Sequence, residues 1–230
     1  MIGIIGAMEE EVAHLREAMD IQETAEYASM NFCKGTLCGK DVVIVQSGIG
    51  KVNAAICAQI LVDKYSVDTL INTGVAGSLD ARIDIGDIVI STDAVQHDMD
   101  ATTFGDPLGQ VPRMKVLAFP ADKMLVEKAK AANEKANPEI QTFVGRVASG
   151  DQFVADRKAK ERIVENFGAL CTEMEGASIA HAAYLNKVSC VIIRAISDKA
   201  DNSAVMDYPD FERRAIKQNV RVMKELLTML

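Results

Sequence analysis

Short apolar runs of strand length alternate with longer segments of helical periodicity along almost the whole chain. This alternation is typical of an α/β fold, in which helices pack on the faces of a β-sheet. Two of the strand-like runs, 32–37 and 41–46, flank Cys38-Gly39-Lys40, which predicts a hairpin. Because a hairpin is antiparallel, we expect a three-layer α/β/α arrangement with a mixed central β-sheet.

The pattern places each expected element within a few residues. The expected strands are residues 2–7, 32–37, 41–46, 69–73, 87–95, 143–148, 170–174 and 188–196. The expected helices are residues 9–19, 52–65, 121–135, 155–166, 176–186 and 208–229. Residues 98–120 are rich in glycine and proline and should form a long loop, either a lid or a subunit contact.

Size and charge limit the classes of partner. A chain of 230 residues, 49% of them hydrophobic, can form one domain over residues 1–230. The net charge of -8 disfavours phosphate backbones and anionic lipid, so neither nucleic acid nor membrane is expected as a partner. No apolar run approaches the ~20 residues that span a bilayer, and the first residues do not resemble a signal peptide.

The cysteines and histidines predict neither disulfides nor a metal centre. Five cysteines, an odd number without CxxC spacing, fit free thiols in a reducing cytoplasm. The three histidines are far apart and form no HExxH or HxH pattern. In the segment 97–100 a single histidine accompanies two aspartates, which we interpret as loop caps. No cofactor is expected.

Six polar clusters that contain glycine or carboxylates stand where predicted strands end, and ligands bind at that edge in open α/β sheets. These clusters are residues 6–11, 47–51, 72–77, 149–153, 173–175 and 194–198. The cluster 47–51 is not a phosphate loop, because it lacks the first glycine and has Val52 at the Ser/Thr position. It is also a weak dinucleotide motif, since Asn53 replaces the third glycine. The six clusters predict one shared pocket.

Several acidic residues of these clusters also have simple structural interpretations. Glutamates 9–11 open a helix, where negative charge is favoured, and Glu173, Glu175 and Asp198 could be surface or turn residues. Arg194 is harder to explain, because it lies inside an aliphatic run and a buried guanidinium needs a carboxylate partner. We expect that partner to be Glu11 or Glu175.

Taken together and in order, the clusters resemble the bacterial 5'-methylthioadenosine/S-adenosylhomocysteine nucleosidases of the purine nucleoside phosphorylase/uridine phosphorylase family. The segments that carry the resemblance are IGIIGAMEEEV at 2–12, SGIGKVNAA at 47–55, the stretch 97–105, SGDQF at 149–153, EMEGASIAH at 173–181 and RAISDKAD at 194–201. The resemblance implies a nucleoside phosphorylase-like fold and a homodimer in which loop 98–120 completes the neighbouring pocket. It also implies hydrolysis of the N-glycosidic bond of these nucleosides, in methionine salvage and the activated methyl cycle.

The resemblance assigns four catalytic residues. Glu11 matches the family's general base, which polarises the attacking water, and Arg194 is similar to the arginine near that water. Asp198 matches the general acid that protonates the purine at N7, and Ser197 helps to orient its carboxyl group. Cleavage leaves positive charge on the ribosyl ring and negative charge on the purine, so two separated carboxyl groups suit it. Asp198 should lie in a dry site, and Glu11 should stay anionic with help from water and Arg194.

The resemblance also assigns the substrate contacts. Glu175 matches the residue that holds the ribose hydroxyls, Phe153 the ring that stacks on adenine, and the backbone of Val154 the group that reads the adenine edge. The other implied contacts are Met8, Met174, Ala76, Gly77 and Tyr208, with Phe104 and Pro112 entering from the neighbouring subunit. Val75 departs from the pattern, because many members have a serine there that can donate a hydrogen bond.

Three alternatives remain open. A phosphorylase on the same scaffold would need cations around phosphate, whereas the first loop here is Met-Glu-Glu-Glu at 8–11. A futalosine or AMP nucleosidase would differ in substrate only, and AMP would need a cation at its 5' end that the sequence does not reveal. A non-catalytic nucleoside-binding protein would not need Glu11, Glu175 and Asp198 together.

Overall fold

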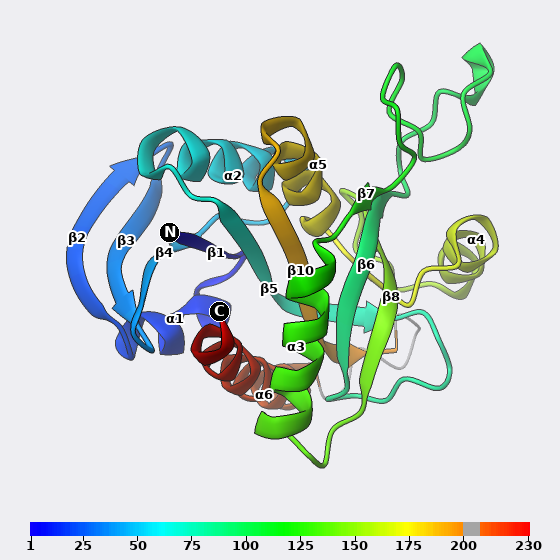
Figure 1. Cartoon of the computed structure of the whole chain (residues 1–230). Coiled ribbons are helices and arrows are strands. Elements are labelled where there is room, and N and C mark those ends of the chain that lie inside the picture. Colours follow the sequence, from blue (N-terminus) through cyan, green and yellow to red (C-terminus); the bar gives the residue numbers. More distant parts are fainter. Residues whose placement is uncertain (200–207) are drawn as a thin grey trace.

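The computed structural model describes residues 1–199 and 208–230, with side chains at all of these positions except 208–212. The strands are β1 (Ile2–Gly6), β2 (Asp20–Tyr27), β3 (Met30–Leu37), β4 (Lys40–Gln46), β5 (Thr69–Ser78), β6 (Ile88–Gln96), β7 (Phe119–Pro120), β8 (Thr142–Ser149), β9 (Cys171–Glu173) and β10 (Ser189–Asp198). The helices are α1 (Glu9–Glu17), α2 (Lys51–Tyr65), α3 (Lys123–Ala136), α4 (Arg157–Phe167), α5 (Gly176–Asn186) and α6 (Tyr208–Met229), with a 3-10 turn η1 (Thr102–Phe104). Figure 1 shows their arrangement.

The strands form one mixed sheet that closes on itself on one side. Strand β5 pairs in parallel with β1 and β10 and antiparallel with β9. Strand β10 pairs with β6, β6 with β8, and β8 with β9, which completes a circuit of five strands. Beyond β1, the sheet continues through β4, β3 and β2, with β3 and β4 as the predicted hairpin. The predicted mixed α/β fold is therefore confirmed.

Helices cover both faces of this sheet (Figure 1). On one face, α2 and α5 pack through residues such as Leu61 and Ile179 onto the strands. On the other face, α1, α3 and α6 pack through residues such as Leu15 and Leu226. Strand β1 is buried along its whole length for this reason, and its sequence is continuously apolar or glycine rather than alternating. Among the described helices, none is long and apolar enough to cross a membrane.

The sequence prediction missed two strands, β2 and the two-residue β7 within the predicted loop 98–120, and shortened two others. Strand β2 has the sequence DIQETAEY and is almost fully exposed, so it has neither an apolar run nor a buried face to reveal it. It lies at the edge of the sheet, where charged side chains discourage pairing with other chains. Strands β5 and β10 extend past their apolar runs to Ser78 and Asp198, because backbone pairing continues where the side chains become polar.

The sheet register brings the predicted polar clusters to one edge. Gly6 at the end of β1 lies beside Gln46, and Arg194 of β10 pairs with Gly74 of β5. Ser149 at the end of β8 pairs with Glu173 at the end of β9. The long segment between β6 and β7, which carries η1, projects away from the body of the molecule (Figure 1).

Candidate active site

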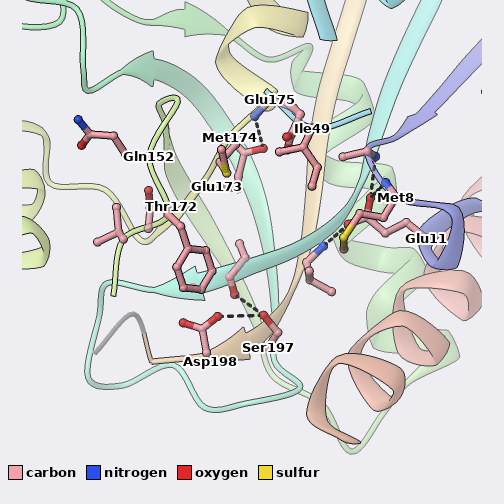
Figure 2. A pocket seen from close by; sticks show the side chains of 16 residues that line it. Met8, Glu11, Ile49, Gln152, Thr172, Glu173, Met174, Glu175, Ser197 and Asp198 are labelled. Atoms are coloured by element: carbon pink, nitrogen blue, oxygen red, sulfur yellow. Dashed lines mark hydrogen bonds between the residues drawn. The ribbon is translucent and has the colours of Figure 1, made fainter. Parts of the chain in front are cut away.

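A pocket lies at this edge of the sheet, and each of the six clusters contributes residues to it (Figure 2). Its lining residues are Ala7, Met8, Glu11, Ile49, Val75, Ala76, Gly77, Gln152, Phe153, Val154, Thr172, Glu173, Met174, Glu175, Ser197 and Asp198. Ten of the fourteen residues proposed from the sequence for this site are therefore in its wall. The exceptions are Arg194, which lies behind the wall, Phe104 and Pro112, which are exposed elsewhere on the chain, and Tyr208, whose side chain lies outside the described residues.

Glu11 lies in the first turn of α1 and its carboxylate folds back onto the backbone. Oε2 accepts hydrogen bonds from the N–H groups of Ala7 at 2.6 Å and Met8 at 3.0 Å, and Oε1 accepts one from Val75 at 3.0 Å. Burial raises the pKa of Glu11, while the Arg194 charge and these backbone donors oppose the rise. A carboxylate with a raised pKa is a better proton acceptor than an exposed one. The geometry fits a general base.

The pairing predicted for Arg194 is wrong. Arg194 is 2% exposed, and its Nη2 donates to the carboxylate of Glu173 and to Asn72 Oδ1, not to Glu11 or Glu175. The sequence offered several nearby carboxylates, and only the register of β9 and β10 across β5 decides which of them meets the guanidinium. Glu173 and Asn72 are therefore site residues that the sequence prediction missed, although both stand in the polar clusters.

Glu175 caps the start of α5 with its backbone and points its side chain toward α2. Its Oε1 accepts a hydrogen bond from Gly50 N at 2.8 Å. Burial and the neighbouring negative charge of Glu173 raise the pKa of Glu175 to about 7. Met174, beside it, also lines the pocket. Glu175 can thus accept hydrogen bonds from a ligand at neutral pH or carry a proton slightly below it.

Ser197 and Asp198 end strand β10 at another side of the pocket from Glu11 (Figure 2). The pairing of β10 with β5 shifts register between Ile196 and Asp198, and such a bulge re-aims the side chains that follow it. Ser197 Oγ lies 3.1 Å from Asp198 Oδ2 and 3.4 Å from the carbonyl oxygen of Ala76. Asp198 is 5% exposed, so its carboxyl group is largely removed from water.

The loop that carries Phe153 is tied to α2 and to the loop after β6. Asp151 Oδ1 accepts from Lys51 N at 2.8 Å, and Asp151 N donates to Asp98 Oδ2 at 2.9 Å. Lys51 Nζ completes the ring with an ion pair to Asp98 at 2.7 Å. We call Lys51, Asp98 and Asp151 the loop clamp. Asp100 caps its loop as expected, since it accepts a hydrogen bond from Thr102 N at 2.9 Å. Asp98 differs from the expectation, because its carboxylate binds Lys51 Nζ and Asp151 N instead.

The walls between the polar groups are apolar. Met8, Ile49, Val75 and Val154 line the pocket, and the Phe153 ring stands at its rim with 66% of its surface exposed. A flat, apolar-faced ligand with polar edges suits such a space. Two carboxyl groups at separate sides of that ligand could act as acid and base in one cleavage reaction. The described residues contain no group of three or more metal-ligating side chains.

Comparisons with known proteins agree with this geometry. The model of the phosphorylase superfamily matches residues 1–228. The chain is 43% identical over 231 residues to the 5'-methylthioadenosine/S-adenosylhomocysteine nucleosidase of Staphylococcus carnosus, with 100% of both chains covered.

Solved structures are similar over the same length. The nucleosidase of the same name from Neisseria meningitidis, in complex with methylthio-immucillin-A, has a TM-score of 0.95 and 36% identity and covers 100% of this chain and 99% of that one. Futalosine hydrolase of Helicobacter pylori has a TM-score of 0.93 and 33% identity, with 100% and 97% covered.

Proposed function

The chain belongs to the phosphorylase superfamily, and on this premise we propose that it is a 5'-methylthioadenosine/S-adenosylhomocysteine nucleosidase in which residues 1–230 act as one domain. It hydrolyses the N-glycosidic bond and releases adenine and the 5-substituted ribose. The observation that carries this function is the placement of two buried carboxyl groups, Glu11 and Asp198, at separate sides of one apolar-walled pocket. Nothing in this reaction requires a cofactor.

Glu11 acts as the general base. The three backbone N–H groups hold its carboxylate in one orientation, and its raised pKa favours taking a proton from water as that water attacks the anomeric carbon. Arg194 lies behind Glu11 and contributes positive charge close to the attacking water. The anionic carboxylates around the pocket stabilise the positive charge that develops on the ribosyl ring.

Asp198 acts as the general acid at N7 of the purine. Burial disfavours the charged form of a carboxyl group, so a largely buried Asp198 can hold the proton that the departing base needs. Ser197 donates a hydrogen bond to Asp198 Oδ2 and so helps to fix the rotation of this carboxyl group in the pocket wall. Protonation at N7 neutralises the leaving group, so the bond to N9 breaks at a lower barrier.

Glu175 and Phe153 bind the two halves of the nucleoside. Glu175 accepts hydrogen bonds from the ribose hydroxyls, with its carboxylate oriented by Gly50 N and with Met8 and Met174 against the sugar. The Phe153 ring stacks on adenine, an interaction of about 1–3 kcal/mol per base. Val154 reads the adenine edge through its backbone, while Ala76 and Gly77 form the floor near the sugar.

A second copy of the chain completes the pocket on its open side. Ile49, Val52 and Ile56 form an exposed apolar strip at the start of α2, with 54%, 69% and 41% of their surfaces exposed. Contiguous exposed apolar residues of this kind mark protein interfaces. Ile49 also lines the pocket, so the partner subunit meets the substrate site. We assign Phe104 and Pro112 of the projecting loop to the partner's pocket.

A cytoplasmic location fits the thiols. Cys33, Cys38, Cys57, Cys171 and Cys190 are all free. Burial raises the pKa of Cys57, Cys171 and Cys190, the last to about 12, so these thiols stay protonated and inert.

The decisive experiment is the release of adenine from 5'-methylthioadenosine by the purified protein in phosphate-free buffer. We expect full activity without phosphate and no pentose 1-phosphate among the products when phosphate is added. A strict phosphate requirement would make the protein a phosphorylase instead. S-adenosylhomocysteine and futalosine should be assayed in parallel, because futalosine is the substrate named for the Helicobacter pylori relative. A higher kcat/KM for futalosine than for the proposed substrates would overturn the substrate assignment.

A further inference from the structure

Glu173 lies at the centre of a buried network of hydrogen bonds and one ion pair. Its carboxylate accepts hydrogen bonds from Ser149 Oγ, from Gly176 N at 2.8 Å and from Glu175 N at 3.2 Å. It also pairs with Arg194 Nη2, and both side chains of this ion pair are almost completely buried. Every lone-pair direction of the Glu173 carboxylate is therefore used by protein groups, which is the condition for a buried charge to be stable.

Arg194 has three carboxylates around it and forms its ion pair with only one of them among the described residues. Glu11, Glu173 and Glu175 each act electrostatically on Arg194. Glu173, which itself lines the pocket, holds the guanidinium together with Asn72. The Glu11 carboxylate instead accepts hydrogen bonds from three backbone N–H groups, and the Glu175 carboxylate accepts one from Gly50 N.

Gly74 shows how close Glu11 and Arg194 lie without pairing. A Cβ atom at Gly74 would overlap Glu11 Oε1 and would lie 3.1 Å from Arg194 Nη1. Both groups thus pack against the Gly74 backbone at the position that a Cβ atom would occupy. Without Glu173, Arg194 would be an unpaired buried cation beside Glu11, and it would turn toward the nearest carboxylate.

We propose that Glu173 is a positioning residue of the proposed nucleosidase: it binds Arg194, so that Glu11 remains available to the attacking water and Glu175 to the ribose. The inference rests on the proposed function. Glu173 does not touch the reacting atoms in this arrangement. It acts through Arg194, by neutralising its charge and fixing its position, and through Glu175, whose backbone N–H it binds.

The charge around Glu173 explains how this positioning changes chemistry. The titratable and charged groups that face it are Arg194 from β10, Glu11 from α1, Glu175 before α5, Cys171 from β9 and His97 after β6. Burial raises the pKa of the Cys171 thiol and lowers that of His97, so both are neutral near pH 7. The Arg194 guanidinium lowers the pKa of Glu173, so Glu173 is anionic near pH 7. The charges of Arg194 and Glu173 therefore cancel beside the other two carboxylates.

The variant Glu173→Gln tests the inference, because the amide keeps the shape and removes the charge. Arg194 then carries an uncompensated charge next to Glu11 and Glu175, which lowers the pKa of both carboxylates. We expect the acid limb of the kcat/KM profile to move to lower pH by about one unit, as one nearby charge typically does. Turnover should fall about tenfold or more, because a less basic Glu11 is a weaker proton acceptor. A loss of activity with an unmoved acid limb would reduce Glu173 to a structural residue and overturn the inference.

Two further variants make this test specific. Asp93→Asn breaks the other partly buried arginine–carboxylate pair, Arg146–Asp93 at 2.6 Å, which lies away from the pocket, and its pH profile should match that of the wild type. Glu173→Gln combined with Arg194→Gln removes both charges together, so its acid limb should return to the wild-type position even though turnover stays low. A double variant whose acid limb is displaced from the wild-type position contradicts the inference. Because this comparison is with the wild type, it can be made even if Glu173→Gln alone does not fold.

The same data separate this inference from the proposed function. A wild-type protein that releases no adenine from 5'-methylthioadenosine refutes the nucleosidase assignment. An active wild type whose acid limb is unchanged in Glu173→Gln refutes only the role of Glu173.

Discussion

Three of the four carboxyl groups that line the pocket, Glu11, Glu175 and Asp198, have different hydrogen-bond partners, and we propose a different task for each. Glu11 is bound by three backbone donors, Glu175 by one, and Asp198 by the Ser197 hydroxyl. Burial raises the pKa of both Glu11 and Glu175, and carboxyl groups with perturbed pKa values are typical of functional sites. Arg194 can support this arrangement only because its own charge is matched by Glu173. At the residue scale, the hydrogen-bond donors around Glu11 and Glu175 support the roles that we propose for them.

The general-acid role of Asp198 can be tested by Asp198→Asn. The amide has the same size and can still contact Ser197, so we expect the fold and the thermal midpoint to change little. Turnover should fall by about 10²–10⁴-fold, because the variant has no proton to give to N7. Steady-state adenine release and a thermal melt measure the two effects on the same sample. Near-normal turnover would remove Asp198 from the acid role, and Asp100→Asn, in the projecting loop, is the matched control.

Glu175 should make the stability of the protein depend on pH. Its pKa rises from 4.5 to about 7 in the folded chain, so between these values the folded state binds more protons than the unfolded state. Stability is then present at low pH and is lost as the pH rises through this window. Glu175→Gln removes the buried charge and should raise the thermal midpoint at pH 8 by roughly 2–4 °C or more, with little gain at pH 5.

Thermal unfolding of the wild type and of Glu175→Gln at both pH values measures this difference. An equal shift at pH 5 and pH 8 would show that the carboxylate does not titrate in the window. The variant should also bind nucleosides weakly, since an amide accepts hydrogen bonds from the ribose hydroxyls less strongly than a carboxylate does. Stability gained where function is lost is common at binding sites.

The sequence could reveal the chemical type of these residues but not their partners. The six polar clusters marked the strand ends, and the family resemblance selected Glu11, Glu175 and Asp198 among the acidic residues. The partner predicted for Arg194 was wrong. Which carboxylate meets Arg194 depends on the register of three strands, and the apolar pattern of the sequence does not encode that register. Glu173 was set aside for the same reason, since a glutamate at a strand end is equally consistent with an exposed position.

At the scale of elements, the site depends on loops that are held to one another rather than to the sheet. The loop clamp joins the start of α2 to the loop that carries Phe153. The same turn at the start of α2 presents Gly50 N to Glu175. Gly50 has a φ of 98°, which glycine adopts without strain, so the turn can direct its N–H at a carboxylate. Phe153 and Glu175, to which we assign adenine and ribose, are therefore linked through the start of α2.

Lys51→Met should loosen this link. Methionine keeps the length of the side chain but leaves Asp98 without its cation, so the loop with Asp151 and Phe153 loses an anchor. We expect KM for 5'-methylthioadenosine to rise several-fold while kcat changes less, because the acid and base are not part of the clamp. Initial-rate kinetics measure both constants.

Lys135→Met is the matched control for this variant. It breaks an ion pair of the same length, 2.7 Å to Glu225, between α3 and α6 on the other face of the sheet. Its kinetic constants should equal those of the wild type. If Lys51→Met lowers kcat and leaves KM unchanged, the clamp does not position the binding loops.

Helices and strands could be predicted from the sequence wherever a buried face produces a regular spacing of apolar residues. All six helices and the strands with apolar runs were found, since helices on both faces of the sheet make those runs continuous. The exposed strand β2 and the two-residue β7 carry no such pattern. The closure of the sheet through β9 could not be predicted either, because a three-residue strand is too short for its sequence pattern to indicate which strands it pairs with.

At the scale of the whole molecule, two exposed apolar features bear on assembly. The strip formed by Ile49, Val52 and Ile56 begins at the pocket wall. Phe104, 88% exposed, belongs to the segment between β6 and β7, which projects from the body of the molecule (Figure 1). Covering either feature with another surface would remove apolar area from water, which is favourable. Burial of the strip and of the ring against a second copy accounts for both features at once.

Val52→Glu tests this assembly by placing a charge in the centre of the strip. We expect the dimer to dissociate, as judged by light scattering after size-exclusion chromatography, and KM for 5'-methylthioadenosine to rise at least about tenfold, since a lost apolar contact is worth about 1–3 kcal/mol. Met124→Glu, on α3 and 58% exposed, introduces the same charge at a similarly exposed site and should change neither mass nor KM.

Phe104→Ala separates the contribution of the loop from that of the interface. If the Phe104 ring enters the neighbouring pocket, this variant should stay dimeric and yet show a raised KM, with the larger effect on nucleosides that have an apolar 5' substituent. The effect should be small for adenosine itself, which has no group for the ring to cover. A Phe104→Ala dimer with unchanged KM for 5'-methylthioadenosine would show that each pocket is complete within its own chain, and a monomeric wild type would remove the premise on which the loop was assigned.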